Sequence, residues 1–232
     1  MKNKKPQLKK QKLTTGNILV ILACAIFSLT IGLLSGDPII GSLLLATGFI
    51  DSYLASLQKR SNYIFGFANS LLIAYVGFKN GLYGSFISNI FVFAPLQIYG
   101  LITWSRNLGS DKNVKIRKLN RQNSILVTGA CVIGSVIFGY LLTKIPTQRT
   151  AFLDATICCI DACALVMTNL RYRESWWLWV VSGVLSIIVW IGALLDGGPN
   201  SFMRLISAIG FLIINIYGAI KWGAKFKRSK KH

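Results

Sequence analysis

The stretch Gln97–Trp104, with the sequence QIYGLITW, decides the fold because a near copy recurs at Asn215–Trp222 as NIYGAIKW. In both copies an amide side chain stands two residues before a Tyr-Gly pair, and a tryptophan follows the glycine by four residues. Such self-similarity is the sequence signature of a repeated structural unit. Two similar dipeptides, Ile50-Asp51 and Ile160-Asp161, precede the two copies. We therefore expect the chain to contain one unit twice.

Both copies lie in strongly apolar surroundings. Of the 232 residues, 53% are hydrophobic and 14% are charged, and the mean hydropathy is +0.54. Apolar runs of roughly 16–23 residues alternate with short charged clusters, which is the pattern of bilayer-spanning helices. The sequence therefore predicts an all-α integral membrane protein with about eight spans, at residues 18–34, 39–57, 63–78, 82–104, 124–143, 151–170, 176–195 and 202–222.

The basic residues indicate the orientation of these spans. The net charge of +19 is high, but the basic residues flank apolar segments, so we expect membrane topology and no nucleic-acid partner. With the N-terminus inside, 22 of the 26 Lys and Arg residues fall in inner segments. This distribution follows the positive-inside rule, by which cytoplasmic segments carry an excess of Lys and Arg. It predicts a multi-pass protein of the cell (inner, cytoplasmic) membrane with both termini in the cytoplasm.

The spans divide into two three-helix repeats. A three-helix unit crosses the bilayer an odd number of times, so a single linker helix between two copies makes the copies parallel, as in SWEET-like transporters. The predicted organisation is a basic tail (1–17), a peripheral helix (18–34), the first repeat (39–104), a basic loop (105–123), the linker helix (124–143), the second repeat (151–222) and a basic tail (223–232).

Two carboxylates within spans are candidate substrate contacts. Asp51 and Asp161 lie in apolar runs, where an ionisable side chain is a functional hypothesis by default. Their recurrence at matching repeat positions strengthens this interpretation. The alternative is that each residue is protonated or hydrogen-bonds a neighbouring helix.

Aromatic and amide side chains supply further candidates. Trp176 and Trp179 are three residues apart, so they share a helix face and are able to clamp a flat or cationic ring. The alternative is an aromatic belt at the membrane edge. The amides of Asn69, Gln97 and Asn215 lie inside spans, where such groups often join helices. The other candidates for the cavity are Tyr99 and Tyr217, and Pro95 is expected to kink its helix one turn before Gln97 and Tyr99.

The sequence offers no catalytic or metal-binding set. It has no phosphate-cradling glycine loop followed by Lys-Ser/Thr, the one histidine is His232, and the five cysteines all lie in apolar runs. We therefore expect no enzyme activity, no metal and no cofactor.

Three stretches together resemble the PnuC-type vitamin transporter family. They are Phe65–Asn69 (FGFAN), Leu96–Gly100 (LQIYG) with the nearby Trp104, and Glu174–Ser186 (ESWWLWVVSGVLS), within a resemblance that runs from about residue 39 to 222. The resemblance implies facilitated uptake of nicotinamide riboside by alternating access, without ATP or a coupling ion. It also implies a cytosolic kinase that traps the solute by phosphorylation, and it places Trp176, Trp179, Asn69 and Gln97 against the substrate.

Two departures from the family leave the cargo open. Gly183 stands where the family often has Asn, and Leu165 stands where Gln is common. The same fold with thiamine, riboflavin or a deoxynucleoside as its cargo is therefore an alternative. A non-transporting membrane scaffold or receptor subunit is an alternative from a different class. The sequence is compatible with a monomer or with a homo-oligomer.

Overall fold

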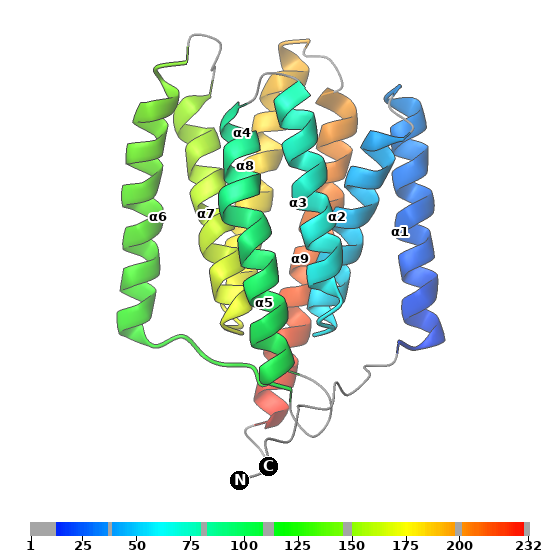
Figure 1. Ribbon diagram of the computed structural model, residues 1–232, viewed down its shortest axis with the longest axis vertical. Helices are drawn as coiled ribbons and strands as arrows, with labels where there is room; N and C mark the ends of the chain where they lie inside the picture. Colours follow the sequence, from blue (N-terminus) through cyan, green and yellow to red (C-terminus); the bar gives the residue numbers. More distant parts are fainter. Residues whose placement is uncertain are drawn as a thin grey trace. The chain divides into compact units, whose positions relative to one another are not determined.

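The computed structural model consists of α-helices (Figure 1) and describes residues 13–36, 39–79, 83–108, 114–145, 150–197 and 201–229. Most of the predicted N-terminal tail, part of the predicted basic loop and the last three residues of the predicted C-terminal tail lie outside the described residues. The described part contains no β-strand, only two isolated bridges.

The helices agree closely with the eight predicted spans. They are α1 (Thr15–Leu34), α2 (Ile40–Ser56), α3 (Asn62–Lys79), α4 (Tyr83–Ser88), η1 (Asn89–Phe93), α5 (Ala94–Arg106), α6 (Arg121–Leu142), α7 (Ala151–Asn169), α8 (Ser175–Leu195) and α9 (Ser201–Ser229). Since α4, η1 and α5 follow one another without a break, they form one long helix. The prediction of an all-helical protein is confirmed.

Helix ends differ from the prediction where capping and basic residues extend the helices. Thr14 and Asn120 begin α1 and α6 as N-caps, since their side chains accept the backbone N–H groups of Asn17 and Asn123. At the other end of the chain, α9 continues to Ser229, so residues 223–229, expected in a tail, are helical. Lysine and arginine are good helix formers and favour a helix C-terminus.

Six helices are long and apolar enough to cross a membrane, namely α1, the segment Phe86–Arg106, α6, α7, α8 and most of α9. The remaining two apolar helices, Ile40–Ser56 and Asn62–Val76, are shorter. Large apolar side chains are exposed along these helices, for example on α1 and α6, as expected for surfaces that face lipid. The chain is therefore a multi-pass membrane protein.

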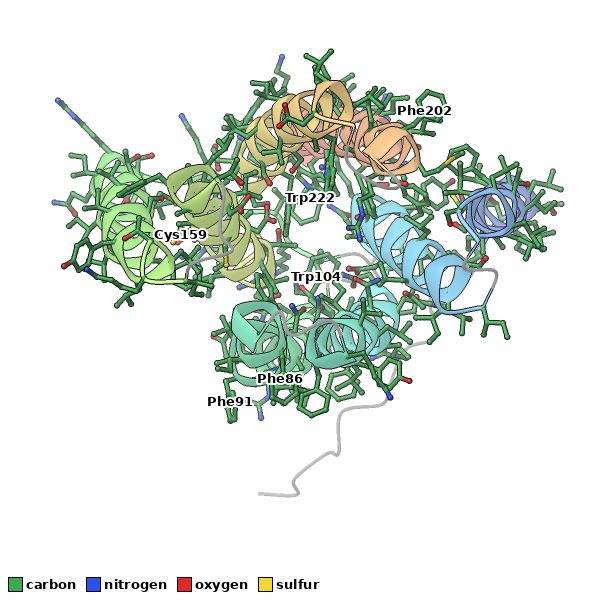
Figure 2. The ribbon with its side chains drawn as sticks, turned by 90° about the horizontal axis from the view of Figure 1, so that it is seen from above. Phe86, Phe91, Trp104, Cys159, Phe202 and Trp222 are labelled. Carbon is green, nitrogen blue, oxygen red and sulfur yellow. The ribbon has the colours of Figure 1, made fainter. Side chains whose placement is uncertain are left out.

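The irregularity expected at Pro95 is a π-helical turn, η1. Proline has no N–H group and its ring clashes with the carbonyl four residues earlier, so a regular α-helix cannot continue through it undisturbed. Just before this proline the Ala94 N–H donates to the Asn89 carbonyl, five residues back. Phe91, labelled in Figure 2, is exposed on this helix, whereas Phe86 packs against Phe78 of α3 and Trp104 further along is buried.

The chain forms two compact units. The first contains the chain up to Ile116 together with Asn169–Arg171, and the second contains Arg117–Thr168 and the chain from Tyr172 onward. In the first unit α2 packs against α1 and α3, and α3 packs against the long helix formed by α4, η1 and α5. In the second unit α8 packs along α9 (Figure 1).

The turns after α2 and α7 have the same hydrogen-bond pattern. Each has a non-glycine residue in the left-handed region, Gln58 at φ 59° and Arg171 at φ 68°. The next N–H group reaches back five residues in both turns, from Lys59 to the Leu54 carbonyl and from Tyr172 to the Met167 carbonyl, at 2.9 Å each. This is the Schellman geometry of a helix C-terminus. Equivalent residues in the two turns are 113 positions apart.

The helices that follow these turns pack through the same kind of contact, an aromatic ring that lies on a glycine and meets a tryptophan. In the first unit Tyr63 meets Trp104 edge-on at 5.0 Å between ring centroids, and in the second unit Trp176 meets Trp222 at 5.8 Å. A glycine lies under the first ring of each pair, Gly100 under Tyr63 and Gly218 under Trp176. The missing side chain allows the ring to touch the helix backbone.

We predict that Gly218→Ala destabilises the protein, because the added methyl group would overlap the Trp176 ring. Overpacking of this kind costs about 1–3 kcal/mol. The measurement is the thermal unfolding midpoint of the purified protein in detergent. Gly223→Ala in the same helix is the matched control, since nothing lies within 4 Å of its added methyl group. Equal midpoints for the two variants would contradict the packing argument.

Candidate functional site

In the first unit, three buried polar side chains meet around two glycines. They are Tyr63, Gln97 and Asn169. A methyl group added at Gly66 would lie 2.5–2.6 Å from the Gln97 side-chain amide, and one added at Gly100 would contact both the Tyr63 ring and the side-chain oxygen Oδ1 of Asn169. Glycine at these two positions therefore brings α3 and α5 close enough for their polar groups to gather. We call Tyr63, Gln97 and Asn169 the polar cluster.

Each member of the polar cluster keeps an unbonded polar atom. The Tyr63 hydroxyl, Gln97 Oε1 and Asn169 Oδ1 are buried without a hydrogen-bond partner. The Asn169 side chain is held in place because its Nδ2 donates to the Leu96 carbonyl at 2.7 Å. Buried polar atoms are nearly always hydrogen-bonded, and leaving one unbonded costs about 1–3 kcal/mol. These three atoms are therefore candidates for contact with a polar ligand.

Sequence reasoning identified Gln97 but missed Tyr63 and Asn169. Asn169 is the last residue of α7. An amide at the end of a predicted span is as easily a surface residue, so the sequence did not single it out. The available signal was an amide within the predicted span 151–170. Tyr63 stands 113 residues before Trp176, which is the offset between the two matching turns. This offset was the signal that would have found it.

Asn69, predicted to face substrate, joins two helices instead of joining the polar cluster. Its Nδ2 donates to the Leu44 carbonyl at 2.6 Å and to the Thr47 hydroxyl at 3.0 Å. Both acceptors belong to α2. The donors of this amide are therefore used in packing α3 against α2.

The two tryptophans that were predicted to contact substrate have different surroundings in the second unit. Trp176 is only 2% exposed and packs on Gly218 and Trp222. Trp179 is partly buried, and its Nε1 donates to the Thr168 hydroxyl at 3.2 Å. Trp176 is thus a packing residue, whereas Trp179 has a ring that is oriented by a hydrogen bond and not enclosed.

Asn215, another predicted site residue, lies beside Trp179. Its Nδ2 donates to the Trp179 backbone carbonyl at 3.1 Å, which ties α9 to α8 at this level. Asn215 and Thr168 therefore fix Trp179 from two sides, one through its backbone and one through its ring.

The two aspartates are not equivalent in the repeats. Asp51 lies seven residues before Gln58, and Asp161 lies ten residues before Arg171, although the two turns match. The expectation of matching positions is therefore wrong by three residues. Three residues are almost one helical turn, so the aspartates occupy a similar face at different depths.

Each aspartate has a polar neighbour in its own unit. The Asn62 side chain lies near Asp51, and the Ser182 side chain lies near Asp161. Asp161 Oδ1 is also buried without a partner. Asp161 therefore has more capacity left to bind a donor or a cation than a fully bonded carboxyl group has.

The two predicted tyrosines lie on the surface. Tyr99 is 48% exposed and Tyr217 is 41% exposed. The Tyr217 hydroxyl accepts a hydrogen bond from Lys221 Nζ at 2.7 Å, one turn further along α9. This placement separates both tyrosines from the buried polar groups.

The positions that depart from the family pattern are apolar in the structure. Leu165 is buried in α7. Gly183 in α8 lies against Leu212 of α9, and a methyl group added at Gly183 would lie 3.3 Å from the Leu212 side chain. Among the residues that the structure describes, no group of three or more His, Cys, Asp or Glu side chains is arranged to hold a metal ion.

Apolar helices that bury unsatisfied polar side chains define the class as a polytopic α-helical membrane protein with groups suited to a polar solute. A family model described as nicotinamide mononucleotide transporter matches residues 38–224, and the chain belongs to this family of transporters.

The chain is similar over most of its length to proteins named nicotinamide riboside transporter PnuC. The one from Neisseria mucosa is 30% identical over 201 residues, which are 83% of this chain and 74% of the relative. The one from Haemophilus influenzae is 27% identical over 186 residues, which are 79% and 78% of the two chains. A solved structure, the crystal structure of the vitamin B3 transporter PnuC, is 29% identical with a TM-score of 0.77 and covers 94% of each chain.

We predict that Trp176→Ala and Trp179→Ala affect stability differently. Removal of the enclosed Trp176 ring leaves a cavity, and such a change costs about 3–5 kcal/mol. Trp179→Ala removes a partly exposed ring and is expected to lower the unfolding midpoint much less. The measurement is thermal unfolding of both purified variants. A larger loss for Trp179→Ala would contradict the assignment of Trp176 to packing.

Proposed function

We propose that the chain takes up nicotinamide riboside or a similar nucleoside-like vitamin across the cell membrane by facilitated diffusion. The observation that carries this proposal is the polar cluster, because it offers unsatisfied hydrogen-bonding atoms at depth in a chain that belongs to a transporter family. The names of the relatives from Neisseria mucosa and Haemophilus influenzae supply the cargo.

The chemistry of nicotinamide riboside suits candidate side chains within each unit taken by itself. Its ribose hydroxyls and carboxamide can donate to Gln97 Oε1 and Asn169 Oδ1 and accept from the Tyr63 hydroxyl. Its positively charged pyridinium ring suits the face of an indole such as Trp179 and a carboxylate such as Asp161. We therefore assign Gln97, Tyr63 and Asn169 to hydrogen bonding and Trp179 to stacking.

We further propose that transport proceeds by alternating access between two parallel three-helix repeats, residues 39–104 and 151–222. Residues 124–143 would be the linker helix and residues 18–34 a peripheral helix. The matching turns at Gln58 and Arg171 and the two glycine–aromatic contacts support two copies of one unit. Because facilitated diffusion cannot accumulate its solute, phosphorylation by a cytosolic kinase would trap it.

The proposed orientation places both termini in the cytoplasm. The support is the concentration of Lys and Arg in alternate joints. We predict that a reporter active only in the cytoplasm remains active when it is fused after the C-terminus, and that a reporter active only outside the cytoplasm does not. The reverse result would overturn the orientation and leave the binding proposal untouched.

A second cargo, thiamine, is favoured by two observations. Leu165 and Gly183 are apolar where the family often has an amide, and Asp161 has an unbonded carboxyl oxygen. A cationic aromatic solute with fewer hydrogen-bonding groups than a nucleoside would use the acid and the tryptophan and need fewer polar contacts.

The deciding experiment is calorimetric titration of the purified protein in detergent with nicotinamide riboside and with thiamine. We expect saturable binding of nicotinamide riboside with a dissociation constant in the micromolar range or below. Gln97→Leu and Trp179→Ala should each weaken binding about tenfold or more, because each removes a hydrogen-bonding or stacking partner. Trp177→Ala, which removes an indole that is 64% exposed, is the matched control and should bind as the unmodified protein does.

The other outcomes are equally informative. Tighter binding of thiamine, lost in Asp161→Asn, would support the second cargo. Binding that survives Gln97→Leu and Trp179→Ala would show that these residues do not form the site. A lack of binding for both compounds, together with no uptake by vesicles that contain the protein, would favour a non-transporting role.

A further inference from the structure

The segment Arg117–Asn120, which leads into α6, lies against the turn Tyr172–Glu174 between α7 and α8. We call the first the strap and the second the corner. The Arg173 N–H donates to the Arg117 carbonyl at 3.1 Å, and the Leu119 N–H donates to Glu174 Oε2 at 3.0 Å. Arg117 and Tyr172 also pair as an isolated parallel bridge. The strap is therefore bonded to the corner by backbone and side chain together.

Aromatic contacts reinforce this attachment. The Arg117 guanidinium lies 4.7 Å from the centroid of the Tyr172 ring, and Asn123 Nδ2 donates to the Tyr172 hydroxyl at 3.4 Å. On the other side of the corner, the Arg173 guanidinium lies 4.7 Å from the centroid of the Phe226 ring near the end of α9. The corner thus connects the start of α6 with the end of α9.

Glu174 has an unusual role for the residue that precedes a helix. It is the N-cap of α8, yet its side chain makes no capping hydrogen bond. The first N–H groups of α8 are bonded instead to corner carbonyls, from Ser175 to Tyr172 at 3.2 Å and from Trp176 to Arg173 at 3.4 Å. The Glu174 carboxylate is consequently left to accept the strap N–H and, at 2.9 Å, the Arg173 Nε.

The equivalent turn in the first unit has no such carboxylate. Counting 113 residues back from Glu174 leads to Ser61, and counting back from Arg173 leads to Arg60. Arg60 donates to the Ser105 hydroxyl at 3.4 Å near the end of α5, much as Arg173 reaches the end of α9. The arginine is common to both turns, whereas the glutamate is an addition to the second. The turn does not need Glu174 in order to form.

We propose that Glu174 is a positioning residue, which holds the strap on the corner and thereby fixes the first turn of α8. That turn carries Trp176 and is followed directly by Trp179, so release of the strap would loosen the tryptophan to which stacking is assigned. The consequence for cargo binding rests on the proposed function. The attachment of the strap does not.

The test is hydrogen–deuterium exchange by mass spectrometry on the full-length protein in detergent. In Glu174→Ala the Leu119 amide loses its acceptor, and we expect exchange in peptides that cover 114–123 and 172–180 to become about tenfold faster. Glu174→Gln keeps an oxygen that can accept this N–H, so it should restore most of the protection. Asp196→Asn, at the exposed opposite end of α8, removes one negative charge without touching the strap and is the matched control.

Nicotinamide riboside titration of the same variants separates the two proposals. We expect Glu174→Ala to weaken binding at least threefold, and Glu174→Gln and Asp196→Asn to bind as the unmodified protein does. Unchanged exchange in Glu174→Ala would overturn the attachment. Faster exchange confined to 114–123 would reduce the strap to a local anchor and overturn the positioning role. Faster exchange of both peptides with unchanged binding would overturn the consequence for cargo binding. If the unmodified protein binds no nicotinamide riboside, the proposed function fails, and the exchange of 172–180 still decides whether Glu174 fixes the start of α8.

Discussion

The structure depends on the requirement that polar groups inside an apolar medium find partners within the protein. Backbone groups meet this requirement by forming helices, which is why the apolar runs of this sequence can adopt little else in a bilayer. Side-chain amides meet it by bonding to backbone carbonyls of neighbouring helices. Asn69 bonds to α2, Asn215 bonds to α8, and Asn169 bonds to the Leu96 carbonyl in α5. The same requirement makes the unbonded oxygens of Gln97 and Asn169 conspicuous.

Close helix contact is the second element of this design. Membrane helices gain little from the hydrophobic effect when they associate, so they depend on close packing and on small residues. Gly100 and Gly218 each receive an aromatic ring on the backbone, and that ring in turn meets Trp104 or Trp222. Gln97 and Asn215 each lie three residues before the glycine of their own helix, so they are at nearly the same level along that helix as the ring contact.

Sequence patterns predicted the helices well because apolar length and charge position follow directly from the bilayer. The Tyr-Gly repeat indicated two copies of one unit, but it did not identify the aromatic ring that lies on each of its glycines. Side-chain roles were harder to predict. Trp176 and Trp179 share a face by spacing, yet only the position of Gly218 on α9 makes one of them a packing residue. The positions of Asp51 and Asp161 in the two units are compared by their distance from the turns at Gln58 and Arg171. Both of these residues are left-handed without being glycine, so the sequence did not predict the turns.

The π-turn before Pro95 affects which residues of its helix can share a face. An α-helix advances by about 100° per residue, so two residues eight positions apart point about 80° away from each other. Asn89 and Gln97 are eight apart, and both are buried. The wider π-turn accommodates one residue more than an α-turn does. The eight residues then rotate by about as much as seven α-helical residues, which is about 20° short of two full turns. The angle between the two amides is thereby reduced from about 80° to about 20°. The proline that disturbs this helix therefore also aligns its two buried amides in a single polar line along the helix.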